Sequence, residues 1–394
     1  MIAPTISFSA LSETHWDVVI VGAGPAGALA AHQCARRNLV TLLVDKAEFP
    51  RYKVCGSCLN ARDRRALRDA GLEAMLDREH AVPLHSLHVA SKRRIARIAL
   101  PQGYVSLSRE RFDAALVRVA IDAGAHFLPS TKARLGNVTT DARAVHLDSL
   151  SPSLTGSTVF ANVILAADGL GGSLMRAQDP GAVANHSHIG IGAISGNAPD
   201  YYGSGITYMA CGTHGYLGLQ RIEDGRLDIA AAVNAAWMRE QGGPAQAAHA
   251  ILRQTPFPPL PGLDDLDWKG TPPLTRTYSA TTLPRVLALG DAAGYIEPFT
   301  GEGIAWALDA ALAVAPIAAT AVNHHDHHIE HAWQQRYRGL ITRRQWICKA
   351  MAAGLRHPRW VQWGVTAVSW VPLLARPLIY EINRARPPQH ASPC

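Results

Sequence analysis

The sequence predicts an α/β fold in which a nucleotide-binding domain is interleaved with a strand-rich α+β domain and followed by a C-terminal helical region. Three observations predict it. An apolar strand enters a glycine-rich turn near the N-terminus, two later strands end in glycine and an acid, and the tail is rich in tryptophan and arginine. The 394 residues, 48% hydrophobic and 18% charged, indicate a globular protein with a large core.

The glycine-rich turn is the most informative element. It follows the apolar run 18–21, which suits a buried parallel strand, and it contains Gly22, Ala23, Gly24, Ala26 and Gly27. In dinucleotide-binding folds, glycines at this spacing permit a tight turn, close approach of a pyrophosphate and close packing of the next helix. A second apolar strand, 40–44, ends in Asp45, which suits a ribose diol, and the next residue, Lys46, is also assigned to cofactor binding. The segment is therefore predicted to form a Rossmann-like unit.

Two further strands are expected to end at the same edge of the sheet. Residues 158–165 lead into Asp168 and Gly169, and residues 285–289 lead into Gly290 and Asp291. A helix is expected to begin around Gly301, Gly303 and Ile304 and to run to about residue 320. Taken alone, Asp291 is also compatible with a helix N-cap.

The order of these elements predicts a discontinuous organisation. Residues 14–75, 100–176 and 280–322 are assigned to the nucleotide-binding domain, residues 76–99 and 177–279 to a substrate domain, and residues 323–394 to the C-terminal region. No second strand-linked Gly-x-Gly-x-x-Gly is found, so a separate nicotinamide domain is not expected.

Together these segments resemble FAD-dependent oxidoreductases, the group that includes aromatic hydroxylases, flavin halogenases and geranylgeranyl reductases, over roughly residues 16–320. The resemblance implies a bound FAD. The ADP half is assigned to the glycine turn with Asp45, and the ribityl chain to Gly290 and Asp291. The helix at Gly301–Ile304 is expected to direct its positive end toward the flavin ring. Further cofactor contacts are expected from Arg51, Arg109, Asp168 and Gly169.

The resemblance also bears on the reaction. It implies an NAD(P)H-driven monooxygenase that uses O2, through a flavin C4a-hydroperoxide, to hydroxylate a lipophilic aromatic, quinone-like or polyketide substrate. Gly294 stands where many aromatic hydroxylases carry histidine, so reduction of a carbon–carbon double bond in an isoprenoid or lipid remains the alternative. Halogenation is disfavoured because the Trp-x-Trp-x-Ile-Pro motif is missing. A further alternative is a non-enzymatic, membrane-associated nucleotide-binding module, which would oxidise no NAD(P)H with any substrate.

No catalytic nucleophile or metal-binding motif is recognised, so the chemistry is assigned to the flavin. Candidate pocket residues are Cys55, Gly56, Tyr216 and Pro298. Cys55 and Cys58 have three interpretations: a redox dithiol, a pocket-lining Cys55 with an incidental Cys58, or inert packing. Tyr216 either covers the flavin or packs in the core.

Charge is concentrated at the C-terminus. The net charge is +7, and from His331 onward ten Lys or Arg face a single acid, Glu381. The main body has no basic stripe, so a nucleic-acid partner is not expected. The tail also contains five tryptophans, which suits either a helix lying in the headgroup layer of a membrane or a helical pair packed on the domain.

Two remaining features concern location and metals. The sequence has neither a recognisable secretory signal nor a disulfide framework, which favours the cytoplasm, with peripheral contact to the inner membrane face left open. The histidine-rich stretch 323–331 lacks fixed ligand spacing and is interpreted as a linker, so no metal site is assigned. The oligomeric state stays open.

Overall fold

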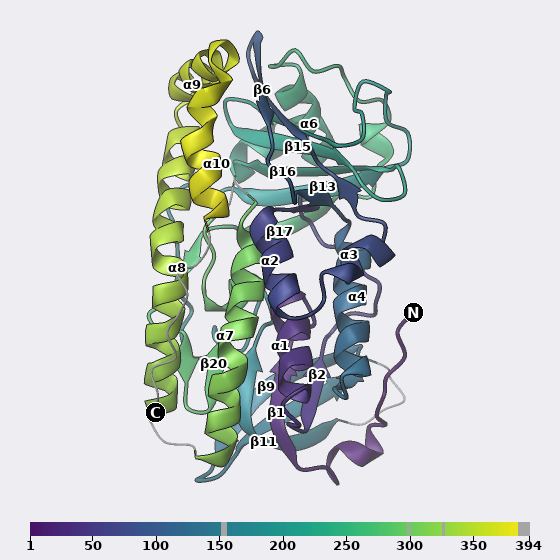
Figure 1. Cartoon of the computed structure of the whole chain (residues 1–394), viewed down its shortest axis with the longest axis vertical. Helices are drawn as coiled ribbons and strands as arrows, with labels where there is room; N and C mark the ends of the chain where they lie inside the picture. Colours follow the sequence, from purple (N-terminus) through teal and green to yellow (C-terminus); the bar gives the residue numbers. More distant parts are fainter. Residues whose placement is uncertain (151–155, 298, 300, 325–327, 385–394) are drawn as a thin grey trace.

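The computed structural model describes residues 1–150, 156–297, 299, 301–324 and 328–384. Two large sheets lie at opposite ends of an elongated molecule, and helix α8 (His328–Leu355) runs along one side past both of them (Figure 1). The predicted class, an α/β nucleotide-binding domain with a strand-rich second domain and a helical C-terminus, is confirmed.

The first sheet carries the glycine-rich turn. Its strand order is β19-β20-β11-β1-β2-β8, and β10 and β9 join it beside β11. Strands β1, β2, β8, β11 and β20 are parallel, so Val21, Val44 and Ala166 lie in register at one edge. The predicted motifs follow these strand ends and therefore meet at this edge. The bounds are β1 Trp16–Val21, β2 Thr41–Val44, β8 His126–Leu128, β9 Thr131–Val138, β10 Arg143–Ser149, β11 Ser157–Ala166, β19 Thr282–Leu283 and β20 Val286–Ala288.

Helices cover the first sheet and join its distant segments. Helix α1 (Pro25–Ala35) is buried along its whole length and packs against α4 (Arg109–Asp122) and α7 (Gly303–Asn323). Its alanine- and glycine-rich sequence allows this close packing because small side chains let backbones approach. Of the described helices, α7 is long and apolar enough to cross a membrane, but 72% of its apolar window is buried in the fold. It is therefore a core helix.

The second sheet has the order β17-β13-β16-β15-β14-β5-β6 and is antiparallel except where β14 pairs with β5. Helices α5 (Ala235–Glu240) and α6 (Pro244–Leu252) come from the same part of the chain. The bounds are β5 Ser86–Ser91, β6 Arg94–Ala99, β13 Ile189–Ser195, β14 Ile206–Cys211, β15 Gly215–Arg221, β16 Leu227–Val233 and β17 Lys269–Pro273.

Short elements connect the two halves. A three-stranded sheet has the order β3-β7-β4, and β12 pairs with β18. The bounds are β3 Cys58–Leu59, β4 Val82–Pro83, β7 Val105–Ser106, β12 Ala182–Val183, β18 Arg276–Thr277, α2 Ala61–Asp69, α3 Ala74–Arg78, η1 Ser9–Leu11, η2 Leu263–Asp265 and η3 Gly290–Ala293.

The C-terminal helices form a layer that we call the cover, residues 358–383. It consists of α9 (Pro358–Trp370), η4 (Pro372–Ala375) and α10 (Arg376–Asn383). Helix α9 packs against β5 and β6 of the second sheet and against α8 (Figure 1). Of the two interpretations of the tail, packing on the domain is therefore confirmed for α9.

Candidate functional site

Two glycines hold the turn after β1 against the end of β11. Gly22 has a φ of +103°, and a Cβ atom at this position would lie 2.2 Å from the carbonyl oxygen of Ala167. A Cβ at Gly27 would lie 1.8 Å from the carbonyl oxygen of Gly22. Any side chain at either position would push backbone atoms apart, so both glycines are required by packing within the turn.

Gly24 faces an open space instead. The nearest atoms to a Cβ built there are the Nη2 atoms of Arg51 and Arg109, each 3.8 Å away. Gly24 is also the N-cap of α1, and because glycine has no side chain, the first N–H groups of the helix receive no side-chain cap there. Unsatisfied N–H groups, a helix dipole and two guanidinium groups around one space suit an anionic phosphate. Ala26, in the first turn of α1, borders the same space.

The two arginines share one buried acid that the sequence analysis missed. Arg109 donates from Nε and Nη2 to Asp113 at 2.8 and 2.7 Å, and Arg51 Nη1 lies 3.0 Å from Asp113 Oδ2. Burial alone would raise the pKa of Asp113, but Arg109 and Arg51 outweigh it and hold that pKa below its usual range. One carboxylate therefore orients both cations toward the turn. The i, i+4 spacing of Arg109 and Asp113 was a signal for this pair.

Asp45 lies directly beside the turn. Its Oδ2 accepts a hydrogen bond from the N–H of Ala23 at 2.6 Å, and its Oδ1 accepts one from Ala47 at 2.8 Å. These bonds fix the carboxylate at the end of β2, and each oxygen keeps further acceptor capacity for a ribose hydroxyl. Lys46 is exposed at this position and does not border the cavity described below.

Asp168 stabilises its own loop. Its Oδ2 accepts hydrogen bonds from the N–H groups of Ser173 and Leu174 at 2.6 and 3.1 Å. Burial raises the pKa of Asp168, and these backbone donors oppose the shift. Gly169 has a φ of +73°, and a Cβ there would lie 3.1 Å from Lys53 Nζ. The acid thus shapes the loop, while Gly169 borders the site itself.

Asp291 and Lys53 lie together near the centre of the molecule. Gly290 and Asp291 form the short helix η3 after β20, and Gly290 adopts a φ of +58°. Burial raises the pKa of Asp291, and Lys53 and Arg109 oppose the shift. Burial also lowers the pKa of Lys53, a trend that Arg109 strengthens and Asp291 opposes. The carboxylate of Asp291 has no hydrogen-bond partner among the described residues, so it is available to a ligand hydroxyl.

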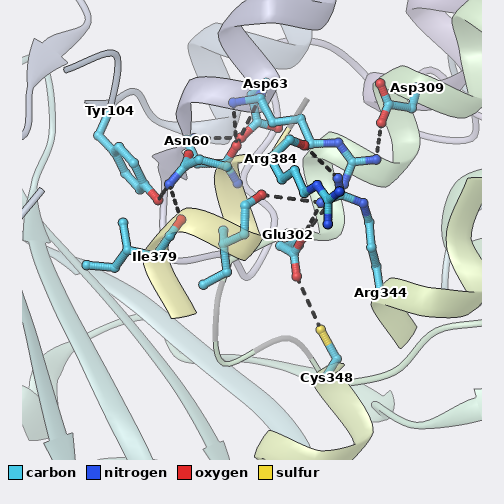
Figure 2. A network of polar contacts seen from close by, with 12 residues as sticks. Asn60, Asp63, Tyr104, Glu302, Asp309, Arg344, Cys348, Ile379 and Arg384 are labelled. Atoms are coloured by element: carbon cyan, nitrogen blue, oxygen red, sulfur yellow. Dashed lines mark hydrogen bonds and ion pairs between the residues drawn. The ribbon is translucent and has the colours of Figure 1, made fainter. Parts of the chain in front are cut away.

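The start of α7 is held by a network that no sequence motif indicated. Glu302, between Gly301 and Gly303, lies 3.1 Å from Arg344 Nη1 and 3.6 Å from Arg62 Nη1, and Cys348 donates to its Oε2 (Figure 2). Helix α7 begins at Gly303, with Ile304 buried behind it. Pro298 lies outside the described residues.

The same network secures the cover. Arg344 donates to the carbonyl oxygens of Ile382 and Arg384, at 3.3 and 2.8 Å, at the end of α10. Asn383 donates to the hydroxyl of Tyr104 and to the carbonyl of Ile379, both at 2.8 Å (Figure 2). Glu302 and the last turn of α10 are therefore joined through one arginine.

A cavity of about 490 Å³ connects these elements. At one end it is bordered by Gly24, Lys53, Arg109 and Asp291, and at the other by the cover. Most of its wall is apolar. The apolar lining includes Leu87, Val89, Ile98 and Leu100 from the second domain and Val365, Val368, Leu374, Leu378, Ile379 and Ile382 from the cover.

The candidate pocket residues Cys55, Gly56 and Tyr216 all line this cavity. Tyr216, on β15, packs edge to face against Phe299 with ring centroids 4.9 Å apart, and burial raises its pKa. Cys58, at the start of β3, lines the cavity too. Cys55 and Cys58 are free thiols, and burial raises the pKa of each. Both thiols are consequently kept protonated.

A buried carboxylate ties the loop of Cys55 and Cys58 to the second sheet. Ser57 Oγ donates to Asp228 Oδ2 at 2.5 Å, and Gln220 donates to the carbonyl of Ser57 at 3.1 Å. Burial raises the pKa of Asp228 to about 7, with nearby Glu223 adding to the shift and the Ser57 hydroxyl opposing it. A single acid within the apolar strand 227–233 was the only sequence signal for it.

Replacing Asp228 with asparagine is expected to stabilise the protein at alkaline pH. The pKa of this carboxyl is about 7 in the folded protein and 3.8 in the unfolded chain. Its contribution to stability is therefore full below pH 3.8, where the acid is neutral in both states, and is lost as the pH rises through 7, where the folded protein must bury a charge. Asparagine keeps an acceptor for Ser57 without the charge. The gain should be on the order of 3 kcal/mol near pH 8.5 and smaller near pH 5, measured by thermal unfolding.

Asp179→Asn serves as the control, because the pKa of Asp179 is shifted in the opposite direction. Ser279 and the backbone N–H of Gly181 lower the pKa of Asp179, so its loss should not stabilise the protein at alkaline pH. An equal gain for Asp228→Asn at both pH values would contradict the assignment of a raised pKa.

The residues around the turn and the cavity fit FAD. The backbone cradle at Gly24 with Arg51 and Arg109 suits the pyrophosphate, and Asp45 suits the adenosine ribose. The carboxylate of Asp291, which accepts no hydrogen bond from the described side chains, suits the ribityl hydroxyls. The N-terminus of α7, whose N-cap Glu302 makes no side-chain capping bond, suits the electron-rich edge of the flavin ring.

Comparisons with known proteins agree with this arrangement. The family model described as "FAD binding domain" matches residues 15–209. A menaquinone reductase of Mycolicibacterium smegmatis is 28% identical over 75% of this chain and 74% of its own. A digeranylgeranylglycerophospholipid reductase of Thermoplasma acidophilum is 25% identical over 86% of this chain and 88% of its own.

Solved structures share the fold. A geranylgeranyl bacteriochlorophyll reductase-like protein of Thermoplasma acidophilum superposes with a TM-score of 0.74 at 20% identity, covering 93% of this chain and 98% of the other. The flavin-dependent brominase Bmp2 gives 0.75 at 17% identity, covering 94% of each chain. Residues 15–209 thus match an FAD-binding domain, and the chain as a whole is similar in sequence to these two reductases and shares the fold of a geranylgeranyl reductase-like protein and a flavin-dependent brominase.

Proposed function

We propose that this protein is an FAD-dependent reductase that saturates a carbon–carbon double bond in a long-chain, isoprenoid-type lipid or quinone. The observation that carries the proposal is the shape and lining of the cavity. It begins at Asp291 and Lys53, where the flavin site is assigned, and extends to the apolar inner side of the cover. A cavity with polar groups at one end and aliphatic walls elsewhere suits a substrate with a long hydrocarbon chain.

The relatives support the same chemistry. Both curated relatives described above carry the word reductase in their names, and they align over about three quarters or more of each chain. Their names refer to a quinone and to a glycerophospholipid with geranylgeranyl chains. This favours reduction over the hydroxylation expected from the sequence.

FAD, when bound, supplies hydride-transfer chemistry, with NADH or NADPH as the proposed source of electrons. The chain's own residues would bind and orient it: Arg51 and the α1 N-terminus would neutralise the pyrophosphate, and Asp291 would accept hydrogen bonds from the ribityl chain. The N-terminus of α7 would favour negative charge on a flavin ring placed beside it. The cover and the second sheet exclude water from the apolar end of the cavity.

Saturating a double bond also requires a proton, which we assign to the thiol of Cys55. Cys55 lines the cavity, and burial raises the pKa of its thiol, so the thiol carries a proton at neutral pH. Addition of a hydride to one carbon and of this proton to its neighbour completes the reduction, and the thiolate recovers its proton from water. Cys58 lines the same cavity and provides a matched control.

Hydroxylation of the same substrate with O2 is the second candidate. The covered, apolar cavity favours it as well, because oxygen activation by a reduced flavin requires a site that excludes water. The two candidates differ in product, since reduction adds two hydrogen atoms and hydroxylation adds one oxygen atom.

The test uses purified, FAD-loaded protein with NADH or NADPH and either a polyprenyl quinone or a geranylgeranylated glycerophospholipid. Under anaerobic conditions, mass spectrometry should find a product with two added hydrogens. Cys55→Ala should lower product formation by about 100-fold while leaving flavin reduction by the nicotinamide unchanged, and Cys58→Ser should have little effect. An oxygenated product formed only in air would replace the proposal with hydroxylation, and abolition by Cys58→Ser would indicate thiol–disulfide chemistry.

A further inference from the structure

The cover has two apolar sides, although one of them faces outward. On the inner side, Val365, Ala375 and Ile382 are buried against the cavity wall. The outer side exposes large apolar and aromatic side chains: Trp360 (64%), Trp363 (72%), Trp370 (72%), Leu373 (56%), Leu374 (57%) and Tyr380 (68%). A helical layer that packs on only one side normally places charged residues on the other, so this outer side needs an explanation.

Basic side chains surround this outer side. Residues 356–380 contain Arg356, Arg359 and Arg376 and no acid. The neighbouring β5–β6 hairpin, 86–99, contains Lys92, Arg93, Arg94 and Arg97, all exposed, and no acid. The guanidinium of Arg94 lies 5.9 Å from the ring centroid of Trp370, which joins the two elements. A second cavity lined by Lys92, Arg93 and Arg253 lies beside Pro358 at the start of α9.

The cavity of the site reaches this surface. Leu374, in η4, lines the cavity and is 57% exposed. Helix η4 therefore borders both the cavity and the outer apolar side.

We propose that the cover docks onto the surface of an anionic lipid bilayer. Tryptophan, tyrosine and leucine side chains of the outer side lie in the headgroup layer, and the surrounding Lys and Arg contact lipid phosphates. A second copy of this chain fits less well, because a two-fold symmetric contact would place the same cations opposite one another. Docking is independent of which reaction the flavin performs.

The experiment measures co-sedimentation of the full-length, FAD-loaded protein with vesicles of phosphatidylcholine containing increasing phosphatidylglycerol. Binding should rise with the anionic fraction and weaken with added salt. The double variant Trp363→Ser, Leu373→Ser, whose two positions do not line the cavity, should lower partitioning at least tenfold. The double variant Arg93→Gln, Arg94→Gln, whose positions lie beside the start of α9 and beside Trp370, should lower it on anionic vesicles alone.

Phe160→Ser is the matched control, since Phe160 is a 52% exposed aromatic residue on β11 of the first sheet. It should leave partitioning unchanged, and all variants should keep their visible flavin absorbance. Absence of binding to anionic vesicles, or binding that the Trp363→Ser, Leu373→Ser pair does not reduce, would overturn the proposal. Concentration-dependent self-association lost in that pair, without vesicle binding, would assign the surface to a second copy instead.

Discussion

Replacing Gly27 with alanine is expected to give a protein that no longer retains FAD. The added Cβ would lie 1.8 Å from the carbonyl oxygen of Gly22 and 3.1 Å from the Cβ of Ala167. Because the first of these atoms belongs to the backbone, α1 must move away from the turn, and its N–H groups no longer converge on the phosphate space. The cost should exceed about 3 kcal/mol, and visible absorbance per unit of protein measures the loss of cofactor.

Two other glycines provide the comparison. A Cβ at Gly171 meets no atom within 4 Å, so Gly171→Ala should retain both stability and flavin. Gly24→Ala has 3.8 Å of clearance and should fold normally, yet its methyl group would occupy the space assigned to the pyrophosphate and weaken FAD binding. If Gly27→Ala kept its full flavin absorbance, the close packing at the turn would not be what organises the cofactor site.

Replacing Glu302 with glutamine is expected to destabilise the protein by about 3 kcal/mol. The carboxylate is 1% exposed and lies between Arg62 and Arg344, which are 6% and 15% exposed. Removing its charge leaves the two buried cations, Arg62 and Arg344, with Asp309, the partner of Arg62, as the remaining carboxylate of the described network. Because Arg344 also binds the carbonyls at the end of α10, the start of α7 and the cover should loosen together.

Denaturant unfolding measures the loss of stability. Limited proteolysis within residues 358–383 measures how far the cover has loosened. Glu73→Gln is the control, since Glu73 binds Arg64 and Arg68 at the surface and should contribute less than about 1 kcal/mol. Equal losses for the two variants would show that burial adds nothing to the Glu302 network.

Local backbone constraints explain what the sequence predicted well. Gly22 and Gly290 adopt positive φ values in their own turns, and Gly27 packs against Gly22 within the turn after β1, so these requirements are visible in the local sequence. Parallel pairing then brings the ends of β1, β2, β11 and β20 to one edge, because strands of this kind align their carboxyl ends. The FAD-binding half of the site follows from these local rules.

The residues that sequence reasoning missed depend on distant partners. Asp228 meets Ser57 across 171 positions, and Arg62 meets Asp309 across 247. No motif records such pairs, because their geometry is set only after both sheets have formed. The role of the cover in closing the cavity was missed for the same reason. Its composition indicated a basic, tryptophan-rich helical region that either lies at a membrane surface or packs on the domain, whereas its inner contacts depend on β5 and β6.

The discontinuity of the first sheet has a consequence for how the protein is made. Strand β20 and helix α7 come from the last third of the chain, yet β20 pairs with β11 in the first sheet and α7 packs on α1. On the ribosome, a nascent polypeptide ending near residue 280 would leave the edge of β11 and the face of α1 bare. Cofactor loading is therefore a late event of biosynthesis, and the unfinished chain is the form most in need of chaperone protection.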